Sequence, residues 1–188
     1  QNAGIISETD TMLVRNPQKA IAILDSLEQM TRLNEKEEMH LIWNRALAFQ
    51  ALGLSLAEED QLLRAITYYR KENEKLADSY LLEASYLYWK GEEEKSKRVI
   101  DKGLTEISDT AKRIRLLVTK AGILEHQHKY EQAASALKEA LTYNMSKKES
   151  AILSYKLGVN LSLLGDRLSE CYYEKGIRLA EENGDTAI

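Results

Sequence analysis

The sequence is poor in the residues that cross-link or interrupt a chain, with one cysteine, Cys171, and one proline among its 188 residues. A lone cysteine excludes an internal disulfide and a cysteine-rich metal site. With one proline and nine glycines, long helices are favoured over strands. The longest apolar-leaning run, 46–57, contains Gln50 and falls far short of the roughly 20 residues that cross a bilayer, so no membrane-spanning helix is expected.

An excess of positive charge is also missing. The chain has 26 Lys and Arg against 30 Asp and Glu, a net charge of −4 and a pI near 5.6. Nucleic acids and anionic lipids are bound through basic surfaces, so neither is expected as a partner of this segment. At 44% hydrophobic and 30% charged residues, the composition indicates a folded chain rather than a disordered one.

What the sequence does have is an internal repeat. Small residues recur at Ala46, Ala84, Ala121 and Gly158, and seven residues after each stand Gly53, Gly91, His128 and Gly165. Successive copies lie 38, 37 and 37 residues apart, and the clearest copy, 157–185, has the pattern helix, tight turn, helix. Such a period, built of two helices, indicates hairpins that bury their apolar faces by stacking on one another.

Local signals set the expected helix ends. N-cap patterns occur at Asn16-Pro17 and, with capping-box spacing, at Asn34/Glu37, Ser55/Glu58 and Ser146/Glu149. A residue with positive φ is expected after a helix at Gly53, Gly91, His128 and Gly165. Gly103 and Gly176 lie inside predicted helices, where we interpret them as points of close helix approach. The predicted helices lie near 5–14, 17–31, 35–52, 58–74, 76–90, 93–107, 110–127, 130–144, 148–164 and 167–182.

These motifs resemble those of the tetratricopeptide repeat. The resemblance rests on Leu157-Gly158, Gly165-Asp166 and 172–175 (YYEK), and on 129–133 (KYEQA) and 65–69 (AITYY). The copies run 36 to 38 residues, where the family usually has 34. The resemblance implies an all-α fold over residues 1–188, a single right-handed solenoid of about five hairpins that is part of a longer chain. It also implies a non-enzymatic scaffold that binds a protein or peptide segment in its concave groove.

In that family the first helices of the hairpins line the groove. The positions that this implies as a binding site are Trp43, Asn44, Leu47, Tyr88, Trp89, Arg115, Thr119, Tyr155 and Lys156. Trp, Tyr and Arg often dominate binding energies, and Arg115 and Lys156 are expected to meet an acidic group. The alternative is that Trp43, Trp89 and Tyr155 simply pack between repeats.

The segments 10–27 and 63–72 also resemble the repeat regions of Bacteroidetes regulatory proteins, many of them exported or lipid-anchored. This resemblance implies an alternative function, the sensor region of a larger regulator that binds a small ligand or peptide. An enclosed pocket around the two tryptophans would favour the sensor, and an open groove the scaffold. It also implies an exported or periplasmic location, with an upstream signal removed. Because solenoid ends need polar caps, we expect the chain to continue beyond Ile188 or this end to pack on another copy.

Chemistry-bearing clusters are sparse. Glu125, His126 and His128 suggest metal ligands, but residues two apart on a helix point about 200° apart, so no metal site is expected. Cys171 is expected to be a small buried side chain rather than a nucleophile. Neither a Gly-rich phosphate loop nor a Ser/His/Asp arrangement occurs in the sequence. We therefore predict that the protein is not an enzyme and has no cofactor.

Overall fold

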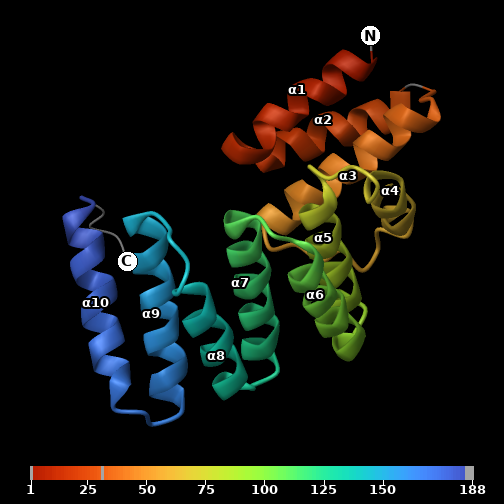
Figure 1. Ribbon diagram of the computed structural model, residues 1–188. Helices are drawn as coiled ribbons and strands as arrows, with labels where there is room; N and C mark the ends of the chain where they lie inside the picture. Colours follow the sequence, from red (N-terminus) through yellow and green to blue (C-terminus); the bar gives the residue numbers. More distant parts are fainter. Residues whose placement is uncertain (1, 31, 185–188) are drawn as a thin grey trace. The chain divides into compact units, whose positions relative to one another are not determined.

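A computed structural model describes residues 2–30 and 32–184, and within them all of the regular structure is α-helical (Figure 1). The predicted all-α class is therefore confirmed for the described part of the chain. The helices are α1 (Asn2–Arg15), α2 (Pro17–Met30), α3 (Glu35–Ala51), α4 (Leu62–Tyr69), α5 (Leu76–Trp89), α6 (Glu93–Glu106), α7 (Thr110–His126), α8 (Tyr130–Ala140), α9 (Lys147–Leu163) and α10 (Leu168–Glu182).

The chain forms two compact units, Gln1–Val99 (unit 1) and Ile100–Ile188 (unit 2). Each unit has its own apolar core. The core of unit 1 includes Ile6, Leu24, Met39, Ile42, Trp43, Leu62, Ile66 and Leu82. The core of unit 2 includes Ile114, Leu117, Leu124, Leu137, Leu153, Leu157 and Leu161.

Helices that follow one another in the sequence pack together within each unit. In unit 1, α1 contacts α2 and α3, and α3 contacts α4 and α5. In unit 2, α8 packs against α7 and α9, and α9 packs against α10. These helices thus bury their apolar faces against near neighbours in the chain, as helical hairpins do.

The small residues of the sequence repeat are buried at equivalent places in both units. Ala46 and Ala84 of unit 1 and Ala121 and Gly158 of unit 2 are all buried in the cores. A Cβ added to Gly158 would lie 2.9 Å from the Tyr173 ring, so a larger residue would push α10 away from α9. The repeat therefore marks buried positions, and at Gly158 it marks a close contact between α9 and α10.

The turns within the hairpins share one backbone geometry. Gly53, Gly91, His128 and Gly165 have φ of 66°, 76°, 57° and 68°, as the sequence predicts. Each turn closes with a hydrogen bond from the next residue back to the helix, for example from Asp166 N to Leu161 O at 2.9 Å. Together with the bond from Gly165 N to Ser162 O, this is the Schellman arrangement, which satisfies carbonyls at a helix end.

Two of the predicted capping boxes are present. Asn34 Oδ1 accepts from Glu37 N at 3.0 Å, and the Glu37 carboxylate accepts from Asn34 N at 3.1 Å. Ser146 and Glu149 make the same reciprocal pair at the start of α9. These bonds satisfy N–H groups that a helix start leaves without an internal partner.

The third capping box, at Ser55 and Glu58, is wrong. Ser55 Oγ accepts from Ala57 N within the loop, and α4 begins only at Leu62, so the predicted helix 58–74 is much shorter. The reason is tertiary: Leu56 is fully buried, and Glu59 accepts hydrogen bonds from Arg45 on α3. Packing of this loop on α3 overrides the local helix signal.

Candidate protein-interaction surfaces

The nine groove positions inferred from the sequence lie on four helices. In unit 1, α3 holds Trp43, Asn44 and Leu47, and α5 holds Tyr88 and Trp89. In unit 2, α7 holds Arg115 and Thr119, and α9 holds Tyr155 and Lys156.

Trp43 and Asn44 are core residues of unit 1. Trp43 is 2% exposed, and its ring lies 5.0 Å from that of Tyr69, between centroids. Leu47 is half-buried against the same core. Trp43 thus packs in the core, as in the alternative in which the aromatic residues pack between repeats. Its side chain offers no surface to a ligand.

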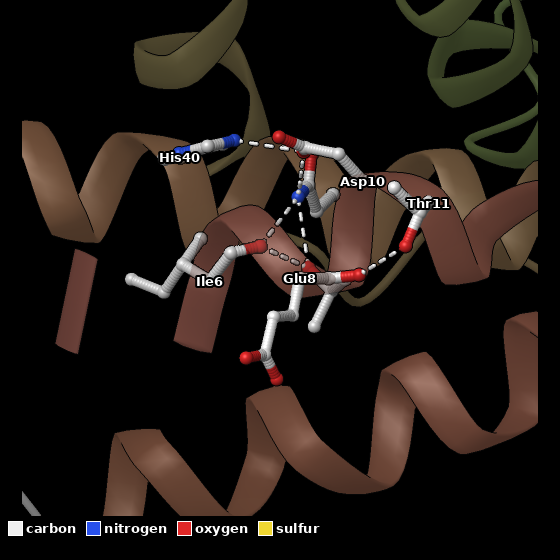
Figure 2. A network of polar contacts seen from close by, with 7 residues as sticks. Ile6, Glu8, Asp10, Thr11 and His40 are labelled. Atoms are coloured by element: carbon white, nitrogen blue, oxygen red, sulfur yellow. Dashed lines mark hydrogen bonds and ion pairs between the residues drawn. The ribbon is translucent and has the colours of Figure 1, made fainter. Parts of the chain in front are cut away.

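Asn44 belongs to a polar network that fastens α3 to α1. Figure 2 labels Ile6, Asp10 and His40 of this network. Its Nδ2 donates to Asp10 Oδ1 at 2.6 Å and to Thr9 Oγ1 at 2.9 Å. His40 Nε2 lies 3.0 Å from Asp10 Oδ1, and Thr9 in turn donates to the Ile6 carbonyl. A buried amide needs such partners, because an unpaired one would cost about 1–3 kcal/mol. The network is therefore a structural tie, which the spacing of the sequence did not reveal.

The side chain of Lys75 covers the aromatic pair Trp43 and Tyr69 on the outer side of the core. Lys75 Nζ lies 3.5 Å from the Tyr69 ring centroid and 5.6 Å from that of Trp43. Burial lowers the pKa of Lys75, although the nearby carboxylates of Glu72 and Asp10 oppose this. Burial also raises the pKa of Tyr69 to about 12. The loop after α4 thus closes the core over Trp43 with a cation–π contact.

The exposed aromatic surface of unit 1 lies at the end of α5. Trp89 is 43% exposed, and its ring stands edge-on to Tyr88 with centroids 5.6 Å apart. Burial, followed by the charge of Glu93, raises the pKa of the half-buried Tyr88. On the same helix, Ser85 Oγ accepts a hydrogen bond from Gln50 of α3 at 2.9 Å. We call Tyr88 and Trp89 the α5 surface.

The exposed surface of unit 2 involves α7 and α9. Tyr155 is 39% exposed and its ring lies 5.4 Å from that of Tyr173, while Lys156 and Arg115 are exposed and Thr119 is half-buried. Asn160 of α9 donates to Glu125 of α7 at 2.6 Å, which holds the two helices in register.

Sequence reasoning missed the apolar residues that extend this surface. Ile152 and Leu163 on α9 and Ile177 on α10 are 43%, 58% and 48% exposed. The signal was available in the spacing, because 152, 155, 159 and 163 recur every three or four residues on one side of a helix.

Of the residues considered as metal ligands or as a nucleophile, His128 and Cys171 lie outside the two surfaces described above. His128 Nδ1 lies 2.7 Å from the Tyr130 hydroxyl, and across the described ranges no group of three or more His, Cys, Asp or Glu side chains is arranged to hold a metal ion. The expectation that Cys171 is buried is wrong, since the side chain is exposed. The reason is that α10 turns Gly176 towards α9, and five residues along a helix point about 140° apart.

Among the open cavities of unit 1 are two that no residue of the inferred groove lines. One, of about 450 Å³, lies between α3 and α4 and is lined by Glu35, Met39, Leu63, Arg64, Thr67 and Tyr68. The other, of about 400 Å³, surrounds the start of α6. No helix within residues 2–30 or 32–184 combines the length and the apolar character needed to cross a membrane. Comparisons with protein-family models, curated proteins and solved structures find no match to this chain.

Proposed function

We propose that this chain is a non-enzymatic interaction module of the tetratricopeptide type, which binds protein or peptide segments on the exposed faces of its first helices. The observation that carries the proposal is the exposure of Trp89 beside Tyr88, on a helix whose other side is firmly held in a core. When a partner buries the exposed part of a tryptophan side chain, the burial stabilises the complex. Such residues are common binding hot spots.

The rigidity of the supporting helices favours this function. The bond from Gln50 to Ser85 ties α5 to α3 in unit 1, and the bond from Asn160 to Glu125 ties α9 to α7 in unit 2. A surface that is already ordered loses little conformational entropy on binding, so more of the contact energy appears as affinity.

The two surfaces suit different chemistry. The α5 surface is aromatic and suits an apolar or aromatic anchor of a peptide. The surface of unit 2 combines Tyr155 with the cations Arg115 and Lys156, which suits a partner that carries a carboxylate beside an apolar side chain. Trp43 and Asn44 take no part, because they are buried.

The solenoid arrangement is also part of the proposal. Its support is the recurrence of one hairpin design, with the same buried small residues and the same turn geometry in both units. The sensor alternative would need an enclosed pocket around both tryptophans. Trp43 is in the core and Trp89 is on the surface, so no observation favours that alternative over the scaffold.

A peptide selection tests the proposal. Peptides enriched on the purified chain from a displayed library should bind with Kd values in the micromolar range, measured by fluorescence anisotropy. Trp89→Ala should weaken binding by about 30-fold, the loss expected for a hot spot worth about 2 kcal/mol. Tyr68→Ala is the matched control, because Tyr68 is also an exposed aromatic of unit 1 but lies on α4. Failure to enrich any peptide, or equal losses in both variants, would contradict the proposal.

A further inference from the structure

The exposed apolar side chains of unit 2 form a continuous strip across two helices. We define the α9–α10 face as Ile152, Tyr155, Val159 and Leu163 on α9 together with Tyr173 and Ile177 on α10 (blue helices in Figure 1). Ile152, Tyr155, Leu163 and Ile177 are each exposed, and the Tyr155 and Tyr173 rings touch between the helices. A strip of this kind is unusual on a surface that nothing covers.

Three contacts establish the register of α9 and α10, that is, which residues of the two helices lie side by side. Gly176 lies against the backbone of Ala151 and Tyr155, and Gly158 lies against Tyr173. Lys147 Nζ is 2.9 Å from the Glu182 carboxylate. Because the helices are antiparallel, Ile152 on α9 is level with Ile177 on α10.

Charge is distributed unequally around these two isoleucines. On α9, Lys148 and Lys156 stand one turn before and one turn after Ile152. On α10, Glu174 and Glu181 stand one turn before and one turn after Ile177. All four charged side chains are exposed. The face therefore has an apolar centre, with Lys148 and Lys156 beside it on α9 and Glu174 and Glu181 beside it on α10; one exposed charge of the opposite sign also stands on each helix, Glu149 on α9 and Arg178 on α10.

We propose that the α9–α10 face binds a second copy of this chain, in a dimer whose two-fold axis runs parallel to the hairpin. This inference rests on the proposed function, since it names the partner of the α9 part of that surface. About such an axis, α9 of each copy lies over α10 of the other, as a self-complementary interface requires. Ile152 then contacts Ile177 of the second copy, and the apolar strips of both copies are buried in the interface.

The charges select this arrangement over its competitor. With the axis parallel to the hairpin, Lys156 faces Glu174 of the second copy and Lys148 faces its Glu181. A two-fold axis across the hairpin would instead place α9 over α9 and bring lysines against lysines. Like charges opposed in an interface are strongly unfavourable, so these four charges favour the first geometry.

Sedimentation velocity over a concentration series tests the proposal on the purified chain. We expect a dimer for the wild type, and at least a tenfold weaker dimer for Ile177→Glu, because a carboxylate would be buried at the centre of the interface. Leu168→Glu is the matched control: Leu168 is an exposed apolar residue of the same helix outside the face, and its replacement should leave the dimer unchanged. Circular dichroism establishes that each variant is folded.

A charge exchange tests the geometry. Lys156→Glu and Glu174→Lys should each weaken the dimer at least fivefold, and the double variant should restore it, because the pair is only reversed. A monomeric wild type, a dimer indifferent to Ile177→Glu, or a double variant no tighter than the single ones would overturn the proposal, as would a selected peptide from another protein bound on this face of a monomer.

The same experiments separate this inference from the proposed function. Peptide binding at Trp89 is measured in parallel on the wild type and on Ile177→Glu. A monomer that still binds peptides at Trp89 would reject the dimer and leave the proposed function standing. A dimer that passes the charge exchange supports the inference even when no peptide is enriched.

Discussion

At the scale of single residues, exposure separates the two tryptophans. Both stand on helices that open a hairpin, and the sequence pattern treats them alike. Trp43 is covered by Tyr69 and by the Lys75 side chain, which reaches it from a loop more than thirty positions later, whereas Trp89 remains exposed. This part of the candidate site could not be predicted from spacing, because one of the two covering side chains, Lys75, comes from a loop without a helical period.

Tyr69 provides a residue-scale test through its pKa of about 12. In the unfolded chain a tyrosine ionises near pH 10, so between about pH 10 and pH 12 only the unfolded state loses the proton. Stability should therefore fall as pH rises through this window. Ultraviolet titration should show one of the ten tyrosines ionising about two pH units late, and Tyr69→Phe should remove that step.

The control for this titration is Tyr68→Phe, which should keep a late step but move it to a slightly lower pH, because burial, the main cause of the raised pKa of Tyr69, is retained and only the smaller contribution of the Tyr68 charge is lost. If the late step survives in Tyr69→Phe, it belongs to another tyrosine. The contact of Tyr69 with Trp43 and Lys75 then does not bury the Tyr69 hydroxyl.

At the scale of elements, local capping signals predicted helix starts where no tertiary contact competed with them. Asn34 with Glu37 has two mutual hydrogen bonds at the start of α3, and no distant residue competes for them. Ser55 has the same spacing to Glu58, but the burial of Leu56 holds that segment as a loop. Boundaries are therefore predictable where local bonds act alone, and fail where a loop is packed onto a core.

Close approach of α9 and α10 can be measured with a pair of glycine substitutions in unit 2. A Cβ at Gly176 would lie 3.1 Å from Ala151 O and Tyr155 N, whereas a Cβ at Gly122 in α7 meets nothing within 4 Å. Both changes to alanine gain about 1 kcal/mol of helix propensity. Gly122→Ala should therefore raise the free energy of unfolding by about 0.5–1 kcal/mol.

Gly176→Ala should lower that free energy by about 1–2 kcal/mol, because displacing backbone atoms costs more than the propensity gained. Urea unfolding of both variants beside the wild type makes the measurement. A stabilised Gly176→Ala would show that the hairpin has more room than the contacts indicate.

At the scale of the whole molecule, the repeat period was the most informative part of the sequence. It led to the all-α class, to nearly all of the helices and to the positive φ of His128. The boundary between the two units, Val99 and Ile100, falls inside the continuous helix α6. A helical period identifies which side of a helix is apolar, but it carries no signal for such a boundary.

The central claim of this account is that one hairpin design recurs, with equivalent small residues at its points of closest packing. The most direct test is the free energy of unfolding of Ala46→Leu, Ala84→Leu and Ala121→Leu, beside the exposed controls Ala22→Leu and Ala111→Leu. Overpacking should cost each of the first three about 1–3 kcal/mol, while the controls should change by less than about 0.5 kcal/mol. Costs no larger at the repeat positions than at the controls would contradict the claim.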